Sequence, residues 1–199
     1  MGSGLTRIDI WNHALDLLRE QPLAAVTDDD AVAQWLTRNY AQQRDYLLGN
    51  TYLWKFAVSR ETLAADPTAP AWGWSTRYLI PTDALRIIPP TNNGAWDGTP
   101  IPFEQENGFM LCDVTDGLRL RYIVRKTIEG EFTNGFCEVL AARLAARAAH
   151  WMTGKQSMAQ ELKQGYLGTL NEVKQVEAVQ VAAEHYYDTA ILSERIDYW

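Results

Sequence analysis

Apolar residues recur every three or four positions near the start of the chain, which is the period of an amphipathic helix. Thr6 offers an N-cap oxygen, Asp9 follows three residues later, and Pro22 comes after the last apolar position. The positions on the expected inner face are Ile8, Trp11, Ala14, Leu15 and Leu18. This pattern predicts a first helix that ends before Pro22.

A second helix is predicted to begin after the segment 27–30. Thr27 offers a capping oxygen, and Asp28, Asp29 and Asp30 place negative charge at the start of the helix, where the helix dipole favours it. The aspartates therefore indicate a cap rather than a metal site. The pair Gly49-Asn50 predicts a left-handed C-cap. The apolar face consists of Val32, Leu36, Tyr40 and Leu47, with Trp35 beside it.

The middle of the chain changes to alternation with a period of two, which is typical of strands. Strands are expected over residues 52–58, 85–88 and 118–124, and prolines and Asn-Gly or Asp-Gly pairs mark the turns between them. Asn107-Gly108 predicts a tight hairpin between strands at 103–106 and 109–112. The last strand is expected to present a basic, solvated face with Arg119, Arg121 and Arg125.

Two further helices are predicted in the last third. Asn134–Thr153 is rich in alanine and ends at Gly154, which indicates a central helix packed closely by its neighbours. Ser157 and Gln160 form a candidate capping box for a long fourth helix. Two glycines, Gly165 and Gly168, lie within this helix, which indicates either a close backbone approach or a bend.

Together these elements predict a mainly α chain with a β insertion, an α+β fold. The core is expected to resemble a four-helix bundle, with a small antiparallel β-rich middle region. The expected parts of this single domain are a helical hairpin at 1–50, the β-rich region at 51–130, helices that complete the core at 131–185, and a C-terminal docking tail at 186–199.

Composition narrows the class of protein. The net charge is −7 and Lys and Arg form no block, which argues against a protein that binds nucleic acid by neutralising phosphates. No apolar run approaches the ~20 residues that span a bilayer, and no signal-like segment opens the chain, so an intracellular or packaged protein without membrane contact is expected. Cys112 and Cys137 form no CxxC pair and are expected to be buried, reduced thiols.

No group of residues indicates catalysis, a cofactor or a metal. The three histidines, His13, His150 and His185, lie on separate segments without a second ligand one helical turn away. The pair most compatible with catalysis is Glu104 and Glu106, which share one face of an expected strand in a chain rich in tryptophan. Such a pair is more often an exposed strand edge that deters unwanted pairing. The chain is therefore expected not to be an enzyme.

Arg143, Arg147 and His150 fall at positions i, i+4 and i+7 of the third helix. A positive stripe of this kind can meet phosphate or an acidic neighbour. Since the chain is acidic overall, we interpret these residues as an ion-pair stripe, within the subunit or between subunits.

Aromatic residues exceed what a core of this size requires. The chain has eight tryptophans and nine tyrosines, concentrated in the middle region and in the last residues. Tryptophan and tyrosine are enriched at the centres of protein interfaces. The sequence therefore indicates a protein that assembles.

Several short motifs, in order, resemble the phage tail tubular protein A family, the head-to-tail adaptors of short-tailed phages. The resemblance covers about residues 8 to 150. The motifs that carry it are Asn12-His13-Ala14-Leu15, Tyr40 with Arg44-Asp45, Trp54-Lys55-Phe56-Ala57, Trp74, Tyr78-Leu79-Ile80-Pro81, Asp83-Ala84-Leu85-Arg86, and Phe136 with Leu140-Ala141 and Leu144-Ala145.

The resemblance implies a structural virion protein that forms a ring of about twelve copies between the portal and the tail nozzle. Its partners would be further copies of itself, the portal protein, the nozzle protein, and double-stranded DNA that passes without specific binding. It would be assembled in the host cytoplasm and reside in the neck of the virion.

Two contact surfaces are expected on this basis. The residues assigned to a portal-docking tail are Tyr186, Tyr187, Ile191, Leu192, Tyr198 and Trp199. Those assigned to contact with a neighbouring subunit or the nozzle are Trp72, Trp74, Tyr78, Trp96 and Phe109. The alternative is a saccharide-acting, cell-wall hydrolase that uses Glu104 and Glu106, and a third option is a regulatory helical protein that binds a partner.

Overall fold

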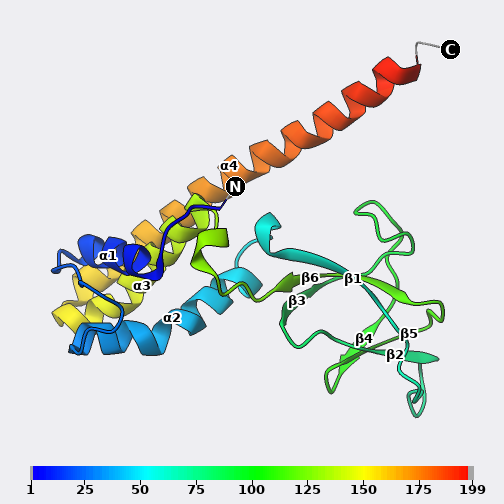
Figure 1. Cartoon of the computed structure of the whole chain (residues 1–199), viewed down its shortest axis with the longest axis horizontal. Coiled ribbons are helices and arrows are strands. Elements are labelled where there is room, and N and C mark those ends of the chain that lie inside the picture. Colours follow the sequence, from blue (N-terminus) through cyan, green and yellow to red (C-terminus); the bar gives the residue numbers. More distant parts are fainter. Residues whose placement is uncertain (1, 197–199) are drawn as a thin grey trace. The chain divides into compact units, whose positions relative to one another are not determined.

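The computed structural model describes the backbone of residues 2–196 and the side chains of residues 2–178 (Figure 1). The fold is α+β, as predicted, with four helices and two three-stranded antiparallel sheets. The chain divides into two compact units. The helical unit comprises Met1–Gln43 and Ile128–Trp199, and the β-rich unit comprises Arg44–Thr127. The β-rich unit therefore also includes the end of the second helix.

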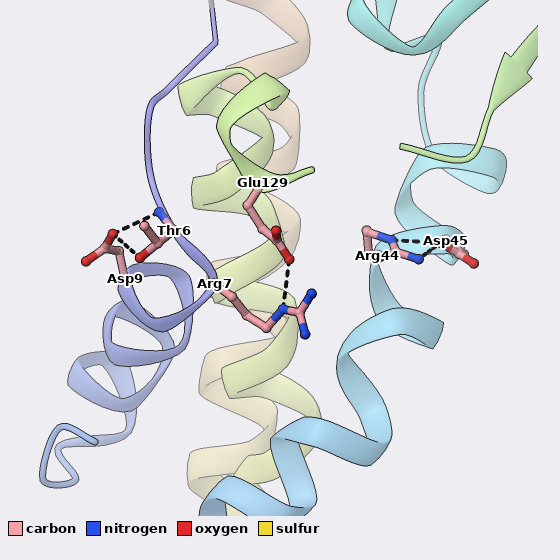
Figure 2. Close-up of polar contacts among 6 residues, drawn as sticks. All are labelled: Thr6, Arg7, Asp9, Arg44, Asp45 and Glu129. Atoms are coloured by element: carbon pink, nitrogen blue, oxygen red, sulfur yellow. Dashed lines mark hydrogen bonds and ion pairs between the residues drawn. The ribbon is translucent and has the colours of Figure 1, made fainter. Parts of the chain in front are cut away.

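In the helical unit, α1 (Arg7–Leu18) begins with the predicted capping box. The backbone N–H and the hydroxyl of Thr6 both donate to Asp9, 2.8 and 2.5 Å from its Oδ2 (Figure 2). These bonds lower the pKa of Asp9. The helix start is also tied to the 3₁₀ turn Glu129–Glu131, because Arg7 Nε donates to Glu129 Oε1 at 2.8 Å.

The ends of α2 (Ala31–Asn50) differ from the prediction. The cap is Asp30, whose Oδ1 accepts from Ala33 N at 2.7 Å, whereas Thr27 lies outside the helix. Asp28 instead closes the preceding turn by accepting from the N–H groups of Ala24 and Ala25. The predicted left-handed C-cap is wrong, because Gly49-Asn50 still belongs to the helix. At its end, the backbone of Gly49 lies against Leu85 of the β-rich unit.

The alanine-rich helix α3 (Asn134–Thr153) is the centre of the helical unit, with α1 and α4 both packed against it. Its predicted ends are confirmed, since Thr133 Oγ1 caps Phe136 N and Gly154 adopts the left-handed conformation with φ 65°. The alanines that are buried in this packing are Ala141, Ala142, Ala145, Ala148 and Ala149. Small side chains along α3 thus let two helices approach it closely.

The last helix, α4 (Gln156–Ile196), starts before Ser157, so the predicted capping box at Ser157 is wrong. Nothing lies within 4 Å of where a Cβ would stand at Gly165 or Gly168. A close backbone approach within the described chain is therefore excluded as the reason for these glycines. The helix also continues through residues 186–196, the segment expected to be a separate tail.

The β-rich unit contains two sheets. One has the order β1 (Val58–Leu63), β6 (Leu118–Val124), β3 (Ala84–Ile88), and the other has the order β2 (Thr76–Leu79), β5 (Phe109–Cys112), β4 (Glu104–Glu106). The predicted hairpin is confirmed, because Asn107 and Gly108 have φ of 47° and 79° between β4 and β5. Both sheets contribute to one core, formed by Leu63, Tyr78, Met110, Cys112, Leu118, Leu120 and Tyr122.

The predicted strand at 52–58 is wrong. Residues Lys55–Ala57 form a 3₁₀ turn, and strand pairing begins only at Val58. The alternation arises because Trp54 turns inward and becomes fully buried, with Nε1 donating to Leu47 O at 2.9 Å, while the rings of Tyr52 and Phe56 lie against it. Among the helices described, none combines the length and the apolar character that crossing a membrane requires.

Candidate functional site

The exposed face of the second sheet carries the most distinctive set of side chains in the β-rich unit. Strand register places Arg77, Leu111 and Glu104 in one row across β2, β5 and β4. The next row on the same face contains Leu79, Phe109 and Glu106. Since side chains two residues apart share a face of a sheet, both glutamates project from the same side.

The loop before β2 forms the other wall of a groove above this face. The groove has a volume of about 300 Å³, and its lining includes Trp72, Trp74 and the two glutamates. Gly73 lies between the tryptophans with φ 84°, a left-handed conformation that favours glycine. Trp72 is 86% exposed, whereas Trp74 is half-buried and donates its Nε1–H to Glu104 Oε2 at 2.8 Å. We call this site the aromatic-acidic groove.

One cation in the groove is already neutralised. Arg77 lies over the ring of Phe109, 4.5 Å from its centroid, and forms an ion pair with Asp66 at 2.9 Å. The N–H of Thr68 and the guanidinium of Arg77 lower the pKa of Asp66. Because Asp66 offsets the charge of Arg77, Glu104 and Glu106 give the groove a net negative charge. Exposed aromatic rings beside carboxylates suit a cationic side chain or a group rich in hydrogen-bond donors.

The residues predicted to contact a neighbour do not form one surface. Trp72, Trp74 and Phe109 lie together in the groove. Tyr78 is wrongly assigned, because it is fully buried and its hydroxyl donates to Val114 O at 2.7 Å. Trp96 is half exposed and lies instead beside Arg121, a residue of the other sheet. Arg77 and Leu79 also belong to this face and are not among the predicted contact residues, although their spacing of two on a strand indicates a shared face.

The predicted ion-pair stripe on α3, Arg143, Arg147 and His150, contains one half-buried residue and two exposed residues. Arg143 is half-buried, where it donates from Nε to Gln43 Oε1 at 2.9 Å and from Nη1 to Tyr166 Oη at 3.3 Å. It therefore links α2 and α4 to α3 through neutral acceptors. Arg147 and His150 are exposed, and the described part of the chain offers them no ion pair.

The remaining candidates for chemistry are separated from one another. His13 lies 3.5 Å from Glu138, and no group of three potential metal ligands occurs among the described residues. Cys112 and Cys137 are buried free thiols, as predicted, and burial raises the pKa of both.

The residues predicted to form a portal-docking tail follow residue 185. The side chains of Tyr186, Tyr187, Ile191 and Leu192, and the whole of Tyr198 and Trp199, lie outside the described residues, as does the side chain of His185.

No protein-family model matches the chain, and no characterised protein matches it in sequence.

Proposed function

We propose that this chain is a structural virion subunit, a head-to-tail adaptor that forms a ring between the portal and the tail nozzle of a short-tailed phage. The ordered motifs over residues 8 to 150 support this proposal. So do the exposed apolar side chains of the β-rich unit, where Trp72, Leu79 and Trp96 are each more than half exposed. Exposed apolar patches are typical of interaction sites.

The observation that carries the proposal is the length of α4. This helix packs against α3, and Val173 is level with Gly135 in the first turn of α3. Beyond Val173, α4 continues to Ile196, for 23 residues or about 35 Å at 1.5 Å per residue. Figure 1 shows this part of α4 running on past α3. The 20-residue α3 cannot cover so long a helix, and an assembly partner would.

Two parts of the subunit have roles in this proposal. The end of α4 and the residues after it dock on the portal, while the β-rich region from residue 72 to residue 124 reaches the nozzle or the neighbouring subunit. The acidic character of the chain, with a net charge of −7, suits a channel through which DNA slides, because phosphate finds little counter-charge there.

Removing residues 186–199 should abolish binding to the portal of the same phage while the fold is kept. We expect the fold to stay intact because Tyr166 and Leu170, the buried residues of α4, lie well before residue 186. The measurement is co-sedimentation with purified portal rings, with circular dichroism to check the fold. A second variant keeps the full length of the chain and replaces Tyr186, Tyr187, Ile191 and Leu192 by alanine, which preserves helix propensity. We expect this variant to lose portal binding as well. Undiminished binding by both variants would refute the docking role.

A hydrolase is the second candidate function, because the groove brings Glu104 and Glu106 together with two tryptophans that can stack on sugars. Glycosidases place their two carboxyl groups on either side of the scissile bond. Here both glutamates are exposed on a single short strand, and one accepts a hydrogen bond from Trp74. This arrangement favours binding over bond cleavage. Turnover of cell-wall polymer that is lost in Glu104→Gln would favour the hydrolase.

A further inference from the structure

A second charged surface lies in the β-rich unit, on the sheet formed by β1, β6 and β3. Arg60 of β1 pairs directly with Arg121 of β6, and Arg119 lies two residues before Arg121 on the same face. Like charges directly opposite each other on antiparallel strands are destabilising. We call Arg60, Arg119 and Arg121 the arginine surface.

The three guanidinium groups lack acidic partners within the described chain. Arg119 donates from Nη1 to the carbonyl oxygen of Asn93 at 3.2 Å, and Arg121 lies over the ring of Trp96 at 4.4 Å. Glu61, on the same strand as Arg60, points to the other face and accepts from the hydroxyl of Tyr122 at 3.3 Å. By contrast, Arg77 and Arg125 of the same unit form ion pairs, Arg77 with Asp66 and Arg125 with Asp45.

Arg121 also has an unpaired donor. Its Nε is buried, and no acceptor lies within hydrogen-bonding distance in the described chain. Burial, followed by the charge of Arg60, lowers the pKa of Arg121. A bound anion would relieve the repulsion between Arg60 and Arg121, and it would offset the cost of holding Arg121 where it is.

The surface is hollowed to receive such a group. A depression of about 230 Å³ is lined by the three arginines together with Asn93 and Gly94. Glu61, Thr62 and Leu120 complete its lining, so the depression holds three cationic residues and one acidic residue. Arginine binds planar anions with two parallel N–H donors, so carboxylates fit the fork geometry. The net charge of −7 opposes the approach of a long phosphate backbone, whereas two or three carboxylates can pair with these few arginines at short range.

We propose that the arginine surface of one copy binds Glu104 and Glu106 in the aromatic-acidic groove of the next copy. The proposal rests on the ring proposed above, and it names the contact that builds the ring. A ring formed head to tail needs two different faces that fit each other, and the β-rich unit carries one of each charge. Both faces are bordered by exposed tryptophan, Trp72 on the groove and Trp96 on the arginine surface, as expected for the centre of an interface.

This contact can be tested by reversing the charges of this chain and measuring how the variants assemble on portal rings. One variant carries Arg60→Glu with Arg119→Glu, and the other carries Glu104→Arg with Glu106→Arg; all four positions are exposed. Each variant alone would place like charges in every junction. We expect the affinity of second and later copies on the portal to fall about tenfold or more, measured by native mass spectrometry of partly filled rings.

The decisive experiment is to mix the two charge-reversed variants on the portal. In an alternating ring every junction again joins arginine to glutamate, so the mixture should fill the portal as the unaltered chain does. Arg38→Glu, an exposed charge reversal in the helical unit, is the control and should leave filling unchanged.

The outcomes separate the two proposals. If the unaltered chain fails to bind the portal, the adaptor proposal falls and this contact with it. If the chain binds but both reversed variants fill the ring normally, or if the mixture does not recover, the contact is refuted and the adaptor proposal stands. Loss in each variant with recovery in the mixture supports the contact.

Discussion

Replacing Trp54 by alanine should lower the free energy of unfolding by about 3–5 kcal/mol, as for other buried tryptophans. Trp54 is fully buried in the β-rich unit, and its ring centroid lies 5.4 Å from that of Tyr52 and 6.3 Å from that of Phe56. Alanine would remove these contacts and leave a cavity. The measurement is urea unfolding monitored by circular dichroism and tryptophan fluorescence. We expect the midpoint of this transition to fall to a much lower urea concentration.

Two control substitutions test the cause of this loss of stability. One removes the hydrogen bond of Trp54, and the other removes a tryptophan that is exposed. Trp54→Phe keeps most of the ring but loses the N–H that donates to Leu47 O, which still accepts from Thr51 Oγ1 at 2.7 Å, so a smaller cost of about 1 kcal/mol is expected. Trp72→Ala, in the exposed groove, should change stability by no more than about 0.5 kcal/mol. Equal stability of Trp54→Ala and Trp72→Ala would contradict the assignment of Trp54 to the core.

Replacing Ala145 by aspartate should destabilise the helical unit by about 3–5 kcal/mol, the cost of an uncompensated buried charge. Ala145 is fully buried in α3, the helix against which α1 and α4 both pack. Aspartate there would bring a carboxylate into a region lined by small apolar side chains. Loss of helical signal at lower temperature, with a raised fraction of aggregated protein, is the expected result.

The neighbouring residue supplies the matched control. Ala146 is half-buried on the same helix, so Ala146→Asp introduces the same charge and the same helix propensity change with access to water. We expect its cost to stay near 1 kcal/mol or below. Equal effects at the two positions would show that α3 is not the closely packed centre described above.

Elements that depend on local chemistry could be predicted from the sequence. The hairpin at Asn107-Gly108 follows from two residues that tolerate positive φ, and the end of α3 follows from its terminal glycine, Gly154. The capping box at Thr6 and Asp9 is equally local. In each case the decisive interaction joins residues a few positions apart.

Elements that depend on tertiary packing could not be predicted from the sequence. The alternation of residues 52–58 resembles a strand, yet Trp54 is buried beside the end of α2 and the backbone forms a 3₁₀ turn. Gly49 belongs to the helix rather than to a left-handed cap, and Leu85, far along the chain, lies 3.4 Å from where a Cβ of residue 49 would stand. Local patterns carry no information on such distant neighbours.

The candidate surfaces show the same division. The shared face of Glu104 and Glu106 follows from spacing alone, but their meeting with Trp72 and Trp74 depends on the pairing of β2 with β5 across about thirty residues of chain. The opposition of Arg60 and Arg121 likewise depends on the register between β1 and β6. Tyr78 was assigned to a surface because it is aromatic, and only the packing of the two sheets shows that it belongs to the core.

The proposed ring on a portal is tested most directly by native mass spectrometry of the full-length chain with and without the portal of the same phage. We expect one closed complex in which many copies of the chain occupy the portal, with or without a ring in the free protein. A chain that does not bind the portal would contradict the proposed ring, and turnover of cell-wall polymer by such a chain would favour the hydrolase.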